Sequence, residues 1–523
     1  MAAFQVQIAN NSNVFSDSQV YVLAFGKAWL PDTGTSAADQ SYVQFDSSGN
    51  GTLVTPDATT LSSAYAQPLT SFPKNSAGNA YVMYLPACTG RVYVSIGQPL
   101  CLNVNVGSAT TISDPNGFNP LDPNYYVIYD KFEFNLVPPD PSLNIAGGVW
   151  IDTTAVDFFG IPFTLSMNGL TAGLTQSRAS LLSTLANALA ASPWNLLALN
   201  APSSLGGSAP LRVMAPDEAI GSSNASANFP DDYFDPYIAA VWSFYENNQL
   251  AIDCSQLIGV SGLNITAANS LFTGQVSNGN FVFTNAAPTT TVTLPLPTSN
   301  DVLGCNGPTT TDPWTPQDST AQGVIVTALD AAMNTGILPL PPSTPAPILM
   351  SPFVPSQLPP YYQNSPQLPT DMQSGGSNPG PWYNLYSAAL HSTGDAIYAF
   401  AFDDEAGQSS TLSSADTSSV ATIAINDMTG TSLPVLTNSE TYTVTFITGD
   451  GAQGSVNGTP LPSQSSTQVS GLASSFTLIY NTGNGNQNYT INLIAGSSCP
   501  MLAGFLPSGT GTTLTIQLPG GTL

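Results

Sequence analysis

Three acidic residues in apolar surroundings are the side chains of this sequence best placed to do chemistry. Glu133 stands between two phenylalanines, and Asp152 and Asp157 lie in the apolar run that follows. A loop containing Pro and Asp, Val137 to Asn144, separates the two segments, which predicts adjacent antiparallel strands. Two carboxylates on neighbouring strands can face one cleft, where one protonates a leaving oxygen and the other acts as base or nucleophile. Hydrolysis of a glycosidic bond requires this pair of roles.

Side-chain alternation leaves the choice of the second carboxylate open. In an unbroken strand that runs to Asp157, this residue shares a face with Thr153, whereas Asp152 shares the other face with Trp150 and Thr154. On that premise the two aspartates cannot both point into one cleft. The residues alone do not decide which aspartate accompanies the glutamate.

Charged residues are scarce, and their balance excludes some classes of partner. They make up 7% of the 523 residues, and 6 Lys and Arg stand against 32 Asp and Glu, which gives a net charge of −26. A chain without a basic patch repels phosphate backbones and anionic membranes, so we expect no nucleic-acid partner and no membrane partner. An uncharged polysaccharide is a compatible partner.

The cysteine and histidine content does not indicate a metal site. The chain has five cysteines and one histidine, and no Cys-x-x-Cys pair. We expect one disulfide between Cys88 and Cys101, which flank a short alternating run, and a second between Cys254 and Cys305, with Cys499 left over. We expect no metal ion and no cofactor.

The composition and the first residues bear on where the protein works. No stretch approaches the roughly 20 apolar residues of a membrane helix. The opening residues, Met-Ala-Ala-Phe-Gln-Val, resemble a strand rather than a cleavable leader. Neutral polar residues must cover much of the surface, as in secreted β-rich proteins. We expect an extracellular monomer whose signal has been removed or that is exported by another route.

Changes in the sequence pattern divide the chain into four parts and predict a mainly β protein with an α/β part. Residues 1–168 alternate and read as a β-sandwich or barrel domain that carries the carboxylates. Residues 169–345 mix helical and strand periods, and residues 346–415 form a return segment that packs on the β domain. Residues 416–523 alternate again and predict a separate C-terminal β-sandwich.

Within these parts, several elements are specific enough to compare with a structure. The predicted elements are helices over Gln176–Ala191, Asp232–Asn248 and Ala321–Asn334, a hairpin over Phe272–Phe283, a short helix around Trp382–His391 and a buried strand over Ala396–Phe402.

The carboxylate region resembles glycoside hydrolase family 64, the laminaripentaose-producing β-1,3-glucanases. The segment Glu133–Pro162 contains Glu-Phe, then Gly-Gly-Val-Trp, then Val-Asp-Phe-Phe-Gly-Ile-Pro. Four further stretches agree with the family in order over roughly residues 15–410, beginning at Arg91 (RVYVSIGQPL), Tyr237 (YIAAVW), Asp301 (DVLGCNGP) and Tyr398 (YAFAFDD).

The resemblance implies a fold and a reaction. The expected fold is a β-sandwich or barrel domain related to thaumatin-like proteins beside a mixed α/β domain, with a wide groove between them. The expected reaction is inverting hydrolysis of β-1,3-glucan of the laminarin or curdlan type, with Glu133 as general acid and Asp157 as general base. In an inverting enzyme the two carboxyl groups lie about 6.5–9.5 Å apart.

The candidate substrate-binding residues are Trp150, Asn135, Thr153 and Thr154. Trp150 matches a groove tryptophan of the family and is a candidate for stacking on sugar. Asn135 stands where the family has a threonine, and the loop between the two carboxylates is longer here. These differences bear on substrate and product length.

Two other classes of function share this scaffold. One is a non-catalytic, lectin-like protein that binds β-1,3-glucan, and the other is a structural protein of a surface layer. An open groove with an intact carboxylate pair favours the enzyme. A groove blocked by the loop from Val137 to Asn144 favours the other two.

Overall fold

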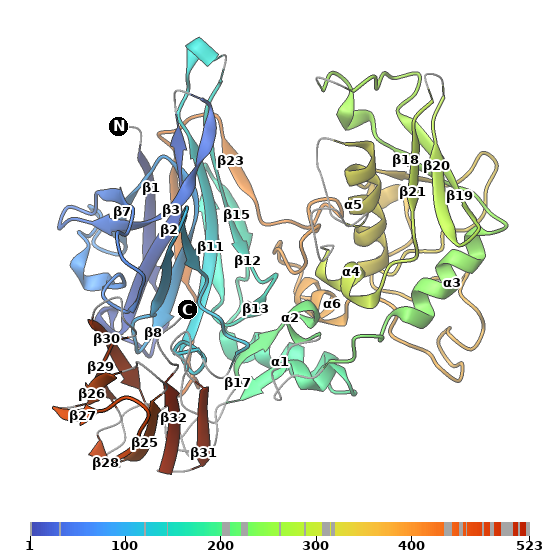
Figure 1. The fold of residues 1–523 in the computed structure, drawn as a ribbon. Helices are drawn as coiled ribbons and strands as arrows, with labels where there is room; N and C mark the ends of the chain where they lie inside the picture. Colours follow the sequence, from blue (N-terminus) through green and yellow to red (C-terminus); the bar gives the residue numbers. More distant parts are fainter. Residues whose placement is uncertain are drawn as a thin grey trace.

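Two large bodies stand side by side and are joined at their base, with a smaller β module beside the first (Figure 1). Among the described residues the strands form seven sheets. The computed structural model describes residues 3–30, 33–119, 122–143, 145–200, 210–220, 229–260, 263–286, 289–305, 314, 320–433, 442–448, 453–456, 458–472, 475–481, 486–492, 506–510 and 513–518.

The first body is a sandwich of two sheets with an apolar core between them. One sheet has the order β15 (Leu170–Gly173), β14 (Phe163–Met167), β24 (Val420–Ile425), β1 (Ala3–Asn10) and β7 (Tyr81–Pro86). The facing sheet has the order β23 (Leu412–Ser414), β12 (Gly148–Thr154), β11 (Ile128–Val137), β8 (Cys88–Ile96), β2 (Val20–Leu30), β3 (Thr35–Phe45) and β4 (Gly51–Val54), and β6 (Gln67–Pro68) pairs with β2.

Strand β24 completes the first sheet from a distant part of the sequence. It lies between β1 and β14, parallel to β1, and Gln5 pairs with Val420. Its inward residues Ala421, Ile423 and Ile425 are fully buried. The boundary expected at residue 416 therefore falls inside the sandwich.

Alternation gives the larger sheet two different faces. On β8, β11 and β12 every second residue, such as Val92, Phe132 and Ile151, points into the sandwich core. The intervening residues point outward. A third sheet covers part of that outer face through a second apolar cluster, with the order β10 (Thr110–Ser113), β9 (Leu102–Val106) and β5 (Thr60–Ser62). The rest of the outer face is free to line a groove.

The second body is a mixed α/β unit around one large core. Its sheet has the order β21 (Thr291–Leu294), β20 (Asn280–Thr284), β19 (Leu271–Ser277), β18 (Leu250–Asp253) and β22 (Ile348–Met350). Its helices are α3 (Asp235–Tyr245), α4 (Ser299–Gly304), α5 (Ala321–Asn334) and α6 (Leu385–His391). Almost every residue of α5 is buried, which is the pattern of a helix enclosed on all sides.

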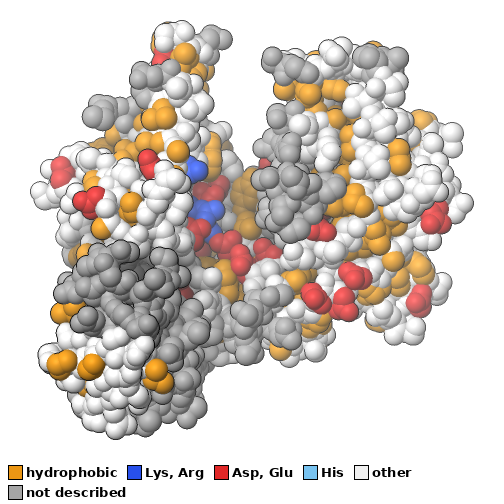
Figure 2. All heavy atoms as spheres, in the orientation of Figure 1, with side chains coloured by type: hydrophobic (Ala, Val, Ile, Leu, Met, Phe, Trp, Pro, Cys, Tyr) orange, Lys and Arg blue, Asp and Glu red, His pale blue; other side chains and the backbone are white. Residues whose placement is uncertain are grey.

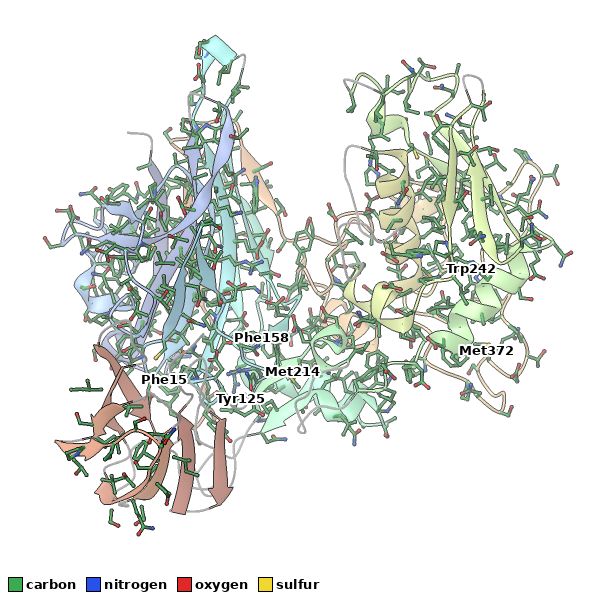
Figure 3. The ribbon with its side chains drawn as sticks, in the orientation of Figure 1. Phe15, Tyr125, Phe158, Met214, Trp242 and Met372 are labelled. Atoms are coloured by element: carbon green, nitrogen blue, oxygen red, sulfur yellow. The ribbon has the colours of Figure 1, made fainter. Side chains whose placement is uncertain are left out.

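A small sheet and two helices join the bodies at their base. The sheet has the order β13 (Phe158–Phe159), β17 (Pro210–Met214) and β16 (Ala198–Asn200), next to α1 (Arg178–Ala188) and α2 (Pro216–Ala219). Phe158 pairs with Met214, and both are labelled in Figure 3 at the junction. Phe158 packs in the outer cluster of the sandwich, whereas Met214 packs in the core of the second body.

The C-terminal part forms two four-stranded sheets in the residues that the structure describes, drawn in dark red in Figure 1. One has the order β28 (Ser466–Leu472), β25 (Tyr442–Thr448), β32 (Thr513–Leu518) and β31 (Leu506–Thr510), and the other β27 (Thr459–Leu461), β26 (Gln453–Val456), β29 (Ser475–Asn481) and β30 (Asn486–Asn492). Cys499 lies outside the described residues.

Most predicted elements are present. The three long predicted helices appear as α1, α3 and α5, the short one as α6, and the hairpin as β19 and β20. The fold is mainly β, with open sheets rather than closed barrels. The relationship to thaumatin-like proteins stays a prediction. None of the helices in the described part of the chain is long and apolar enough to span a membrane.

The strand predicted over Ala396–Phe402 is wrong. This segment is a buried turn whose one ladder contact is an isolated bridge from Tyr398 to Thr154. The carboxylate of Asp403 accepts the backbone N–H groups of Ala399 and Phe400. These donors are therefore not available to a neighbouring strand.

The two predicted disulfides are also wrong, because all four cysteines in the described residues are free. Cys88 lies in the core between the two sandwich sheets, whereas Cys101 belongs to the segment that packs on the opposite face of the larger sheet. The sheet itself separates the two thiols. Cys254 and Cys305 are both buried in the core of the second body, on different elements.

Candidate active site

Three charged residues form a row across the outer face of the larger sheet. Glu133 on β11 pairs directly with Arg91 on β8 on one side and with Asp152 on β12 on the other. Side chains that are directly opposite on neighbouring strands have Cβ atoms about 4.5–5.5 Å apart. The register of the ladder therefore fixes the order arginine, glutamate, aspartate along this row.

The rows above and below supply further polar and aromatic side chains to the same face. Asn135 pairs with Trp150, and Thr89 Oγ1 donates to Asn135 Oδ1 at 3.0 Å. Lys131 pairs with Thr154. All of these residues point away from the sandwich core, as alternation requires.

Strand β12 ends at Thr154, which brings Asp157 to the same side of the sheet as Asp152. Thr154 Oγ1 accepts the N–H of Val156 at 3.3 Å, and the N–H of Ala155 bonds to Tyr398 O at 2.7 Å instead of to the ladder. The chain turns out of the sheet at this point. The premise of an unbroken strand is wrong, and so is its consequence that the two aspartates face opposite sides.

One pocket gathers these side chains. It has a volume of about 320 Å³, and its lining includes Glu133, Asp152, Asp157, Trp150 and Thr154. Its remaining lining residues are Arg91, Lys131, Val156, Tyr398 and Ala401. Figure 2 shows basic and acidic side chains together on the sandwich wall of the hollow between the two bodies.

A second pocket of about 360 Å³ continues along the same wall. It shares Arg91, Glu133 and Trp150 with the first pocket, and Lys27 and Asp114 are among its other lining residues. None of the described residues of the 137–143 loop lines either pocket. The described part of the loop between the carboxylate strands thus forms no wall of these two pockets.

Both candidate catalytic carboxylates are ion-paired. Glu133 Oε1 accepts from Arg91 Nε at 2.7 Å, and Arg91 also pairs with Asp114. Asp157 pairs with the ammonium of Lys131, which is buried while the Asp157 side chain is 28% exposed. The two carboxylates thus have separate cationic partners.

The site holds one carboxyl group that keeps its proton near neutral pH. Burial, with a smaller contribution from the charge of Glu133, raises the pKa of Asp152 to about 8. Burial lowers the pKa of Lys131, and the charge of Arg91 acts in the same direction. These directions follow from the loss of solvation of each charged form.

The turn that carries Asp157 is fixed by buried polar contacts. Asp130 Oδ2 accepts the N–H groups of Gly160 at 2.8 Å and Ile161 at 3.0 Å, and Arg178 Nε donates to Gly160 O at 2.7 Å. Burial raises the pKa of Asp130 to about 7. The N–H of Ala215, just before α2, also donates to Asp157 O at 2.9 Å.

The structure gathers most, but not all, of the candidate site residues. Glu133, Asp157, Trp150 and Thr154 line one pocket, and Asn135 shares their face of the sheet without lining it. The side chain of Thr153 is buried on the opposite face, where the Cβ of any residue replacing Gly173 would contact it. Thr153 is therefore not part of the groove wall.

The sequence reasoning missed the cations and the tyrosine of the site. Arg91, Lys131 and Tyr398 line the pocket with the carboxylates. The signal that could have found the two cations was the scarcity of Lys and Arg in this acidic chain, because a rare cation is expected where a negative charge has to be neutralised.

Among the described residues, no group of three or more His, Cys, Asp or Glu is arranged to hold a metal ion.

Comparison with known families decides the relationship. The profile of glycoside hydrolase family 64, described as beta-1,3-glucanase, matches residues 2–425, which end with β24. The chain belongs to this family. The matched region of this family 64 chain contains the sandwich, the second body and both pockets.

Two curated relatives are glucan endo-1,3-beta-glucosidases. The protein of Arthrobacter sp. (strain YCWD3) is 23% identical over 369 residues, which cover 68% of this chain and 56% of that protein. The protein of Cellulosimicrobium cellulans is 23% identical over 363 residues, which cover 67% and 54%. The family 64 chain spans about half the length of the curated relatives it matches.

Two solved structures show the same fold. A laminaripentaose-producing beta-1,3-glucanase in complex with laminaritetraose has a TM-score of 0.58 and 22% identity, covering 82% of this chain and 99% of that one. A family 64 beta-1,3-glucanase domain from Clostridium beijerinckii has a TM-score of 0.57 and 23% identity, covering 81% and 98%. At these identities the likeness concerns the fold.

Proposed function

We propose that this protein hydrolyses β-1,3-glucan with inversion, with Glu133 as general acid and Asp157 as general base. The observation that carries the proposal is the single pocket that contains both carboxylates, with Trp150 in its wall. Membership of the β-1,3-glucanase family supports the choice of substrate. The laminaritetraose bound to one structural neighbour supports the same class of ligand.

In this mechanism the two carboxylates divide the proton transfers. Glu133 gives its proton to the leaving glycosidic oxygen, while Asp157 takes a proton from the water that attacks the anomeric carbon. Lys131 holds the Asp157 carboxylate in place, and Arg91 holds that of Glu133. Both cations fix geometry without contributing a transferable proton of their own.

The groove accommodates a chain-like ligand across the carboxylates. Its two pockets are continuous at Arg91, Glu133 and Trp150, so a chain-like ligand can pass over the carboxylates. An extracellular place of action and a monomeric state complete the proposal, because an insoluble polymer has to be met outside the cell. The lectin-like function is the alternative that the experiment separates.

The test is reducing-sugar release from laminarin and curdlan by the protein and by its Glu133→Gln and Asp157→Asn variants. We expect oligosaccharide release by the parent protein and a loss of about 100-fold to 10,000-fold in kcat for each variant, the usual range for a general acid or base. Nuclear magnetic resonance of the first product anomer distinguishes inversion from retention.

Asp57→Asn is the matched control, since it makes the same charge change on an exposed residue that lines neither pocket. Thermal melting of all variants excludes a loss of folding. Binding of glucan by the parent protein without any release of sugar would establish the lectin-like function. Full activity of either pocket variant would remove that residue from the mechanism.

A further inference from the structure

Asp152 is a carboxyl group of the site that the proposed acid and base roles leave unused. It lies directly opposite Glu133 in the β11–β12 ladder and lines the same pocket. Its side chain is only 6% exposed. The ladder therefore places two carboxyl groups side by side, one of them almost out of contact with water.

The hydrogen bonding of Asp152 is incomplete. Its Oδ1 atom is buried and has no hydrogen-bond partner among the described residues. A buried, ionised and unpaired carboxylate is strongly unfavourable, and a second negative charge on the adjacent strand adds to that cost. Protonation removes the charge and supplies an O–H donor next to the ladder partner Glu133.

In the row Arg91, Glu133, Asp152, the arginine lies next to the glutamate and not next to the aspartate. Arg91 Nε binds Glu133 on the side away from Asp152, at 2.7 Å. The arginine stabilises negative charge on Glu133, whereas the described residues give Asp152 no cation of its own. The surroundings of Asp152 therefore favour its neutral, protonated form.

We propose that Glu133 and Asp152 share one proton, and that Asp152 is the positioning residue that holds this proton and returns it to Glu133. The inference rests on the proposed hydrolase function, because it explains how a glutamate bound to arginine can act as an acid. It also makes a claim about the resting site that does not need turnover.

The proton transfers balance. The O–H bond of Asp152 breaks as an O–H bond forms on Glu133, and the Glu133 proton then passes to the leaving glycosidic oxygen. Water supplies hydroxide to the anomeric carbon and its second proton to Asp157. Exchange with solvent removes the proton from Asp157 and restores the one on Asp152, so no oxidant, reductant or other reactant is needed.

Other ionisable groups near the pair define the electrostatic background of the test. Five of them line the two pockets, namely Lys131 on β11, Arg91 on β8, Asp114 after β10, Asp157 after β12 and Tyr398 on the turn before β23. Two more, Asp217 and Glu218 on α2, interact electrostatically with Lys131. All of them are present in every variant of Asp152. A change confined to those variants therefore reports on Asp152.

The first experiment compares pH profiles of kcat/KM for the protein and its Asp152→Asn and Asp152→Glu variants on laminarin. We expect the alkaline limb of the parent protein near pH 8, where Asp152 loses its proton. In Asp152→Asn no second carboxyl holds the proton, so we expect this limb to move toward acid by about two pH units or more. Asp152→Glu should restore a limb close to that of the parent.

A structural role of Asp152 gives a different result. Asp152→Asn would then lower the rate equally at every pH, or melt earlier, with its alkaline limb unmoved. Either that outcome or an unchanged profile would overturn the shared proton.

A second experiment needs no activity and separates this inference from the function itself. Infrared difference spectra across pH 6 to 9 should show, besides the carboxyl bands common to both proteins such as that of Asp130, one further protonated carboxyl that the parent protein loses and Asp152→Asn lacks. Glu133→Gln should shift the loss to lower pH, because it removes the neighbouring negative charge. If the parent protein shows this band but releases no sugar, the proposed hydrolase function is refuted and the shared proton is supported. Identical spectra for the parent protein and Asp152→Asn would refute the shared proton.

Discussion

At the scale of single residues, this chain uses its few cations where negative charge has to be held. Three of the 6 Lys and Arg, namely Lys27, Arg91 and Lys131, line the groove pockets. Two more, Arg178 and Arg212, are fully buried and donate to backbone carbonyl groups around the turn after β12 and its neighbours. Arg91 and Lys131 thus hold the two candidate catalytic carboxylates, and the two buried arginines hold neighbouring backbone segments.

Trp150 is the residue whose aromatic ring should set substrate affinity. It is half-buried and lines both pockets, so its ring can contact sugar on either side of the carboxylates. We expect Trp150→Ala to raise KM for laminarin about tenfold, equivalent to about 1.4 kcal/mol of lost contact, with a smaller change in kcat. Trp150→Phe, which keeps a ring, should stay near the parent value. An unchanged KM in Trp150→Ala would contradict a sugar platform at this position.

At the scale of elements, the end of β12 decides the composition of the site. A strand two or three residues longer would have sent Asp157 into the ladder, whereas the bond from Val156 to Thr154 Oγ1 turns the chain toward the groove. The Asp130 and Arg178 contacts to Gly160 then fix the turn. The position of the proposed base therefore depends on where β12 ends and on the buried contacts of Asp130 and Arg178, not on strand periodicity.

These details explain which predictions from sequence succeeded. The start of α5 matches the prediction because Thr320 caps a long apolar run, and its side chain accepts the N–H of Gly323. The pairing of β11 with β12 was predictable from the loop with Pro and Asp that joins them. The turn at Thr154 and the turn before Asp403 were not, because side chains there take over backbone hydrogen bonds that alternation alone assigns to a ladder.

The position of β24 predicts where the chain can be shortened without loss of folding. A chain that ends at Leu433 keeps β24 and the contacts of Asp427 and Thr431 to Arg178, whereas one that ends at Ala415 lacks a central strand of the first sheet. We expect the longer chain to melt cooperatively and to keep its hydrolysis of soluble laminarin. The shorter chain should be insoluble or unfolded, because it exposes the core and two unpaired strand edges. Circular dichroism melts and soluble yield measure both, and a folded shorter chain would contradict this account.

At the scale of the whole molecule, buried carboxyl groups couple stability to pH. Burial raises the pKa of Asp152 to about 8, of Asp130 to about 7 and of Asp122 to about 6. The unfolded chain binds protons at such groups less tightly, with pKa values of about 4. Unfolding therefore releases protons and becomes easier as the pH rises through this range. Self-repulsion of a chain with a net charge of −26 acts in the same direction.

We therefore expect the apparent Tm to be highest near pH 5 and to fall steadily toward pH 8, where Asp152 loses its proton in the folded protein. Asp152→Asn should reduce the difference between the two ends of this range, since its amide does not titrate. The exposed control Asp57→Asn should leave the difference unchanged. Differential scanning fluorimetry over this range makes the comparison, and a Tm that rises with pH would contradict the protonated state of the buried groups.

The parallel pairing of β1 with β24 also orders events during synthesis. Gln5 leaves the ribosome long before its partner Val420, which emerges only after most of the family region has been made. Until then one edge of β1 offers free N–H and C=O groups to any passing strand. The nascent chain must be kept from neighbouring nascent chains for that whole interval, so the yield of folded protein depends on translation rate and on chaperone supply.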